Sequence, residues 1–236
     1  MMFALYVLLT LAALVLAGAV SPARGFASWL PLLVLGWTIG QFNTLIEAVV
    51  FSVMPMRDAL VQLAIASVAV ALLAAVAVSL AGKWRGNGPG VVRPIVNWRT
   101  IAGVVLGYEL LYWTAGTLVW PFVANFYANK PLPAAALVAT LQVPRALIFA
   151  AAAWPWLRTE PRHAPWVLGA AFAVIGGIAP MFPENPYMPS DVRFAHGIET
   201  SVSNSLFGLL VGWLLRAKAA SPSRQARSAD STGLLG

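Results

Sequence analysis

Long apolar segments with few charged residues are the feature that most constrains how this chain folds. A helix that crosses a membrane needs roughly 20 mostly apolar residues, and seven segments meet that length. They are Met1–Val20, Trp29–Met54, Ala59–Leu80, Ile101–Pro121, Pro133–Trp156, Pro165–Phe182 and Phe194–Leu215. Charged residues make up only 10% of the chain, against about a quarter in soluble domains. We therefore expect an all-α, polytopic transmembrane bundle of about seven helices that is surrounded by the lipid bilayer.

The chain is expected to form one domain and a tail. Residues 1–218 contain all the apolar segments, whereas residues 219–236 are rich in Ser, Ala and Arg and predict a disordered cytoplasmic tail. The first segment resembles a secretion signal in length, but no basic residue precedes its apolar run. We expect it to remain as the first membrane span.

Basic residues between the segments predict the orientation. Eleven Lys and Arg residues lie at alternate ends of the segments, three lie at the opposite ends, and Arg145 lies inside a segment. Since Lys and Arg concentrate on the cytoplasmic side, the N-terminus is expected outside and the C-terminus in the cytoplasm. The pattern is typical of a multi-pass protein of a bacterial inner membrane.

Composition also excludes several function classes. The formal net charge is +7, but the basic residues do not form a polar basic face, so no nucleic-acid partner is expected. No Cys is present, which excludes disulfides and thiolate metal sites. No phosphate-binding, dinucleotide-binding or zinc-protease motif occurs. We expect no cofactor and no metal ion.

Polar residues inside the apolar segments are the candidate site residues. Ionisable groups in mid-membrane are costly and usually face the bundle interior or a watery cavity. The candidates are Asn43, Glu47, Glu109, Tyr112, Gln142, Arg145, His196, Glu199 and Asn204. They come from the second, fourth, fifth and seventh segments and fall between the outer interface and mid-bilayer. The shared depth predicts a polar, outward-opening site for a small molecule or a lipid headgroup.

Individual roles stay open at this stage. Arg145 suits an anchor for an anionic group, or a structural ion pair with Glu47, Glu109 or Glu199. His196 and Glu199 suit acid–base chemistry or a hydrogen-bonded network; one His offers few ligands for a transition metal. Three functions follow: binding or transport, an intramembrane enzyme acting on a lipid or isoprenoid, and a structural or assembly subunit. No protein partner is identified by the sequence.

Two patterns resemble known groups. The run Asn185-Pro186-Tyr187-Met188-Pro189, then Val192-Arg193, Ala195-His196, Glu199 and Ser203-Asn204, with Gln142-Val143-Pro144-Arg145 before it, resembles a pattern of uncharacterised bacterial multi-pass membrane proteins. That resemblance covers the C-terminal half and implies membership without an activity. Asn43 and Glu47 are similar to an element of membrane-bound terpene cyclases, although Ile46 stands where that family has Trp. This second resemblance implies acidic groups in a seven-helix bundle that act on an isoprenoid.

Overall fold

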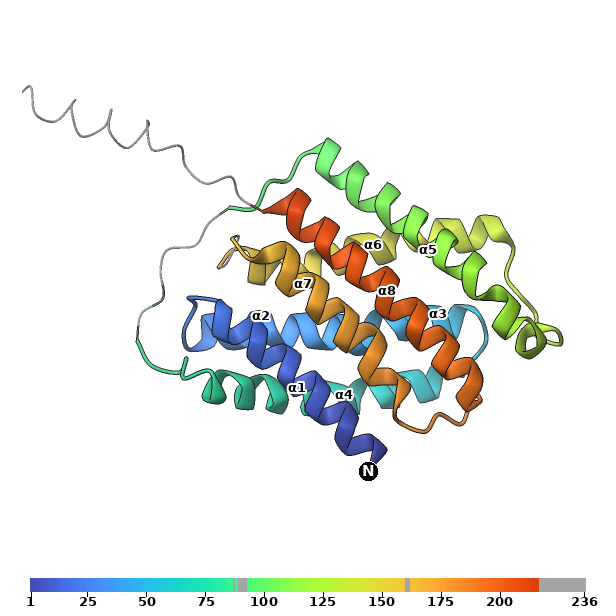
Figure 1. The fold of residues 1–236 in the computed structure, drawn as a ribbon, viewed down its shortest axis with the longest axis horizontal. Helices are drawn as coiled ribbons and strands as arrows, with labels where there is room; N and C mark the ends of the chain where they lie inside the picture. The colour runs from blue at the N-terminus through green and yellow to red at the C-terminus, as the bar shows by residue number, and fades with distance from the viewer. Residues whose placement is uncertain (87, 89–92, 160–161, 217–236) are drawn as a thin grey trace, which may run out of the picture.

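The computed structural model of the chain describes residues 1–86, 88, 93–159 and 162–216. Every regular element among these residues is helical, which confirms the predicted all-α class. The predicted disordered tail, residues 219–236, lies outside the described residues. Figure 1 shows the helices packed side by side as a bundle.

The elements in chain order are α1 (Met2–Val20), α2 (Phe26–Trp37), η1 (Thr38–Phe42), α3 (Asn43–Val50), α4 (Met56–Leu80), α5 (Trp98–Tyr127), α6 (Ala135–Leu157), α7 (Ala164–Ala173), η2 (Val174–Ile178), η3 (Ala179–Met181) and α8 (Ser190–Leu215). The short elements η1 and η2 are π-helical turns and η3 is a 3-10 turn. They continue the helices around them, so the described residues form seven helices long and apolar enough to cross a membrane. The chain is an integral, multi-pass membrane protein.

The helix α5 is longer than the predicted segment Ile101–Pro121. It begins at Trp98 because the Asn97 side chain accepts hydrogen bonds from the backbone nitrogens of Arg99 and Thr100, at 2.9 and 3.0 Å. It continues past Pro121 to Tyr127. Ending the helix at Pro121 would leave further backbone groups unpaired in lipid, which costs more than the one donor that proline removes.

Close contact between α7 and α8 depends on glycine. A Cβ added to Gly208 would lie 2.4 Å from the backbone oxygen of Leu168, and one added to Gly212 would lie 2.6 Å from Cα of Pro165. Small residues at such positions let two helices approach until their backbones touch, so that dispersion contacts hold them together in lipid. Figure 1 shows α7 and α8 running side by side through the bundle.

Aromatic rings fill the core beside this helix pair. Phe207 of α8 lies 5.9 Å from Phe149 of α6, 6.2 Å from Phe172 of α7 and 4.7 Å from Tyr108 of α5, measured between ring centroids. All four side chains are buried. Tilted and edge-on rings at these separations attract each other beyond the area they bury. The cluster therefore fixes α5, α6, α7 and α8 relative to one another.

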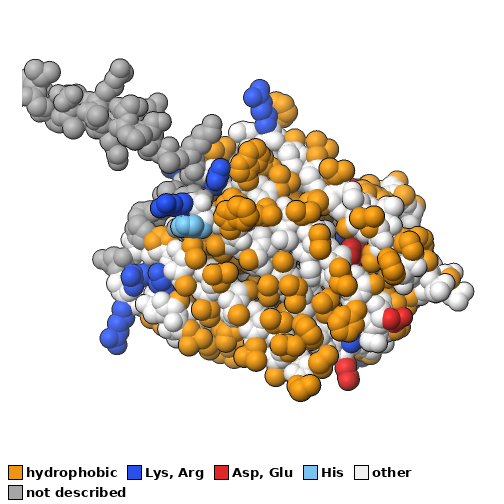
Figure 2. All heavy atoms as spheres, in the orientation of Figure 1, with side chains coloured by type: hydrophobic (Ala, Val, Ile, Leu, Met, Phe, Trp, Pro, Cys, Tyr) orange, Lys and Arg blue, Asp and Glu red, His pale blue; other side chains and the backbone are white. Residues whose placement is uncertain are grey.

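Charged side chains gather at the two ends of the bundle, and the surface between them is largely apolar, as Figure 2 shows for one face. Exposed apolar residues lie along α5 and α8, among them Leu110, Leu118, Ile198 and Val202. An apolar surface of this kind suits contact with lipid. The predicted orientation and the inner membrane stay predictions.

Replacing Gly208 with Val is expected to destabilise the protein. The new side chain would collide with the backbone of Leu168, and overpacking of this kind costs about 1–3 kcal/mol. Thermal unfolding of the purified protein in mild detergent would measure the loss. Ala69→Val, at an exposed position of α4, is the matched control and should unfold like the unaltered protein. Equal stability of the two variants would contradict the close α7–α8 contact.

Candidate functional site

Arg145 is the centre of a buried polar network that joins three helices. Its Nη1 lies 2.6 Å from Oε2 of Glu47 in α3 and donates to Oε1 of Gln142 at 2.7 Å. Its Nε donates to Oδ1 of Asn43 at 3.3 Å. The Tyr112 hydroxyl of α5 donates to the other Glu47 oxygen at 2.6 Å. The sequence left three partners open for Arg145, and the structure pairs it with Glu47.

Burial makes this ion pair important for folding. The side chain of Arg145 is 7% exposed and that of Glu47 is 24% exposed. A charge removed from water is tolerated when it has an opposite charge and hydrogen bonds. The guanidinium also lies 5.8 Å from the Tyr108 ring and 6.0 Å from the Tyr112 ring, from Cζ to each centroid. Arg145 is thus already neutralised and surrounded by side chains of the protein itself.

A π-helical turn positions the α3 part of the network. Residues Thr38–Phe42 form η1, and Asn43 follows it directly. Asn43 and Glu47 are one helical turn apart, so both face α6. The Asn43 amide nitrogen is buried and has no hydrogen-bond partner among the described residues. Turns of this type are frequent at functional sites because they alter the direction of the side chains that follow.

A second polar cluster lies between α5 and α8. Nδ1 of His196 lies 2.7 Å from Oε2 of Glu199, and Nε2 of His196 lies 3.1 Å from the Tyr127 hydroxyl. The His196 side chain is 26% exposed and that of Glu199 is 12% exposed. The three side chains form a chain of hydrogen-bonding groups that can pass a proton between a phenol, an imidazole and a carboxylate.

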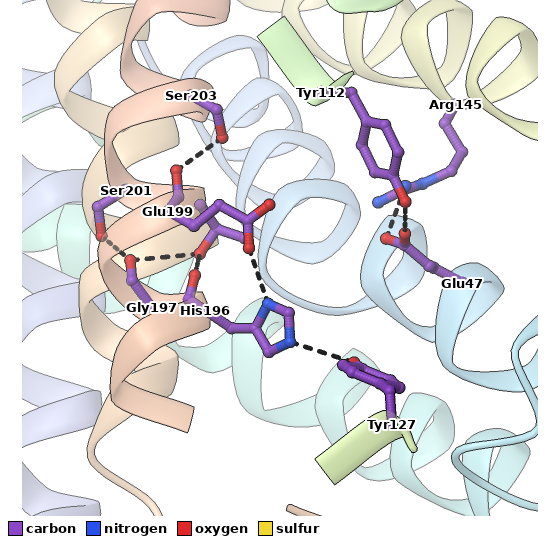
Figure 3. A network of polar contacts seen from close by, with 10 residues as sticks. Glu47, Tyr112, Tyr127, Arg145, His196, Gly197, Glu199, Ser201 and Ser203 are labelled. Atoms are coloured by element: carbon purple, nitrogen blue, oxygen red, sulfur yellow. Dashed lines mark hydrogen bonds and ion pairs between the residues drawn. The ribbon is translucent and has the colours of Figure 1, made fainter. Parts of the chain in front are cut away.

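The two clusters face each other across the inner side of α5. Figure 3 shows Glu47 and Tyr112 on one side and His196 and Glu199 on the other, with Tyr127 below. Both clusters include a tyrosine of α5: the Tyr112 hydroxyl lies 2.6 Å from Glu47, and the Tyr127 hydroxyl lies 3.1 Å from His196. Gly116 of α5 lies beside the second cluster, since a Cβ added there would be in van der Waals contact with Oε1 of Glu199, at 3.7 Å. The four helices predicted to build the site thus place these groups around one region.

Two predicted site residues have their hydrogen-bond partners outside both clusters. Glu109 accepts a hydrogen bond from Nε1 of Trp113 on its own helix, at 2.9 Å. Asn204 donates to the backbone oxygen of Gly176 in the π-helical turn η2, at 3.1 Å. Asn204 therefore ties α8 to η2. Its contact is one of helix packing, and Glu109 holds a surface aromatic ring in place.

Tyr127 is a residue of the site that the sequence interpretation missed. The fourth predicted segment ends at Pro121, so Tyr127 lies outside it. In the structure α5 extends to Tyr127 and brings its hydroxyl to His196. The signal was present as a periodicity: Tyr112 and Tyr127 are fifteen residues apart, close to four helical turns, and so share a face.

The Pro-rich connection before α8 is held by one contact from its middle and one that spans it. The Tyr187 hydroxyl donates to Oδ2 of Asp58 in α4 at 2.5 Å, and Nε of Arg193 donates to the Met181 backbone oxygen at 2.9 Å. The bond to the Asp58 carboxylate raises the pKa of Tyr187, because it favours the protonated phenol. These two contacts hold the connection against α4 and against the end of the preceding helix.

No group of three or more His, Asp or Glu side chains arranged to hold a metal ion occurs in the part of the chain that the structure describes. His196 and Glu199 supply a pair, and Glu47 is engaged by Arg145.

Comparison with known proteins adds no relative. No protein-family model, no curated protein and no solved structure matches the chain. The resemblance to a group of bacterial membrane proteins therefore stays a prediction, and the function must be argued from the geometry.

Replacing Glu47 with Gln is expected to destabilise the protein strongly. It leaves the Arg145 guanidinium buried without a counter-charge, and breaking a buried pair from one side costs about 3–5 kcal/mol. The double variant Glu47→Gln/Arg145→Gln should recover most of that loss, because no charge is then left alone. Unfolding in detergent would measure both.

Glu109→Gln is the matched control for this experiment. Its carboxylate contacts a ring on its own exposed helix face, so a change of about 1 kcal/mol or less is expected. If Glu47→Gln unfolded no earlier than Glu109→Gln, the ion pair would not have the structural role that its burial indicates.

Proposed function

We propose that the protein binds, and by binding transports, a small molecule or a lipid headgroup in the region between α3, α5, α6 and α8. The observation that carries this proposal is the opposition of two polar clusters, one around Arg145 and one around Glu199. Packing helices in lipid needs no second cluster of ionisable groups, and each such group is costly there. Two such clusters facing one region are therefore better explained by a ligand that binds there than by helix packing alone.

The two clusters have different roles in this proposal. The Arg145 cluster is internally neutral and forms a fixed wall, so Arg145 acts through Glu47 and Tyr112 rather than as a free anion anchor. The His196–Glu199 pair is the adaptable part, because an imidazole can donate or accept a hydrogen bond at its ring nitrogens. A ligand therefore meets a carboxylate, an imidazole and the hydroxyls of Tyr112 and Tyr127.

The direction of access follows from the proposed orientation. Both clusters lie in the half of the bundle that contains the end of α5 and the start of α8. The basic residues concentrate at the other side of the bundle, where α5 begins and α8 ends, which favours a cytoplasmic position for that side. In a bacterial inner membrane the site then opens toward the outside.

An intramembrane enzyme is the second candidate function. It is favoured by one observation, the Tyr127–His196–Glu199 chain with separations of 3.1 and 2.7 Å. A carboxylate that orients an imidazole beside a phenol is suited to general acid–base catalysis on a lipid or isoprenoid. Turnover of a lipid extract by the purified protein, lost in Glu199→Gln, would favour this function over transport.

Cysteine accessibility tests whether water reaches the site. The chain has no Cys, so single Cys substitutions at Tyr112, His196 and Glu199 need no background removal. A membrane-impermeant thiol reagent added outside intact cells is expected to label all three. Leu110 and Ile198, exposed residues two positions away on the same helices, are the matched controls and should stay unlabelled.

The opposite result has a clear meaning. If folded, inserted variants were labelled at none of the three site positions, the network would be closed to outside water. A transport site open to the outside would then be excluded, and a structural subunit or an enzyme entered from the lipid would remain.

Ligand binding is tested by thermal shift. Small molecules and lipid headgroups that raise the Tm of the unaltered protein should fail to do so for Glu199→Gln, since ligand binding stabilises only a protein that binds it. Glu109→Gln is the control and should keep every shift. A compound that still raised the Tm of Glu199→Gln would bind at another site.

A further inference from the structure

A groove on the lipid-facing side of the bundle is separate from the polar site. Its volume is about 370 Å³, and its walls are Ile101 and Val104 of α5 and Leu147 and Trp154 of α6. Cavities that hold ligands occupy about 300–1,000 Å³, so the groove is large enough for one. Its lining is apolar throughout, which suits a hydrocarbon chain.

The groove is closed at one end by the chain itself. Val96, in the extended segment before α5, and Leu215, the last residue of α8, line that end. The backbone nitrogen of Ile95 donates to the backbone oxygen of Leu215 at 2.9 Å and holds the segment in place. Figure 1 shows that α5 begins and α8 ends at the same end of the bundle.

The depth of the groove matches that of an acyl chain near a membrane surface. Trp154 lies in the last turn of α6, and Leu147 lies seven residues earlier. Seven residues of helix rise about 10 Å. The groove thus runs from the helix ends toward mid-membrane, and Trp154 sits at the level where aromatic residues meet lipid headgroups.

Three exposed arginines lie at the helix ends next to residues that line the groove. Arg99 follows the cap of α5, Arg158 caps α6 and Arg216 caps α8. Each is exposed and lies within four residues of a side chain that lines the groove. The Arg99 guanidinium lies 5.4 Å from the ring of exposed Trp98. The described acidic residues lie at mid-membrane or toward the other end, so the described part of this end is positively charged.

We propose that this groove binds one acyl chain of an anionic phospholipid, with Arg99, Arg158 and Arg216 holding its phosphate headgroup. Arginine suits phosphate because its planar fork donates two parallel hydrogen bonds. Basic pockets between membrane helices are known to select anionic lipids. The apolar groove alone fits any lipid, and the arginines select the anionic one.

The test compares two lipids with identical acyl chains. Purified full-length protein in detergent receives phosphatidylglycerol or phosphatidylcholine, and its Tm and its bound lipid are measured by thermal unfolding and native mass spectrometry. Phosphatidylglycerol is expected to raise the Tm by about 3 °C and to stay bound to the protein. Phosphatidylcholine should do neither. Equal shifts from both lipids would overturn the proposal.

Two variants locate the effect. Ala150→Trp fills the groove and should abolish the shift, whereas Ala69→Trp, on the exposed surface of α4, should keep it. The triple variant Arg99→Gln/Arg158→Gln/Arg216→Gln keeps the groove and should lose the preference for phosphatidylglycerol. If Ala150→Trp does not fold, the triple variant still decides. A phosphatidylglycerol shift that survives in the triple variant would overturn the proposal.

Discussion

The buried ion pair between Arg145 and Glu47 is the interaction on which the polar half of the bundle depends. It joins α6 to α3, and Tyr112 extends it to α5. A guanidinium in this position requires its partner, because the alternative is an uncompensated charge in a low dielectric. The pair therefore fixes where three helices lie relative to one another, and it gives the opposing His196–Glu199 cluster a rigid wall to face.

The remaining helices need no such polar contact. Glycine lets α7 and α8 meet backbone to backbone, and the rings of Phe149, Phe172 and Phe207 fill the space beside them. Dispersion and shape hold this part together, which suits a solvent as apolar as the helices themselves. The molecule thus divides into a tightly packed apolar part and a polar part that tolerates a ligand.

The sequence predicted the fold class because membrane length and apolar composition determine it almost alone. It also predicted that Asn43, Glu47, Gln142 and Arg145 come together, since each shares a depth and is costly if left unpaired in lipid. It left Tyr127 outside the site, because the predicted segment ends at Pro121. In lipid the helix continues past this proline, since ending it there would leave more backbone groups unpaired. It also grouped Glu109 with the site, and in the structure that carboxylate accepts its hydrogen bond from Trp113 on its own helix.

The π-helical turns have a consequence for insertions and deletions in this protein. Such a turn contains one residue more than the α-helix it interrupts. Because the wider turn absorbs that extra residue, loss of one residue from Thr38–Phe42 would let the segment close into a regular α-helix, with Asn43 and Glu47 still directed toward Arg145. In a regular α-helix, by contrast, one added residue turns everything after it by about 100°. Gly40 lies inside the turn, where an added Cβ would lie 3.0 Å from Ile175 of the second π turn. The segment therefore accommodates the loss of a residue better than it accommodates a side chain at Gly40.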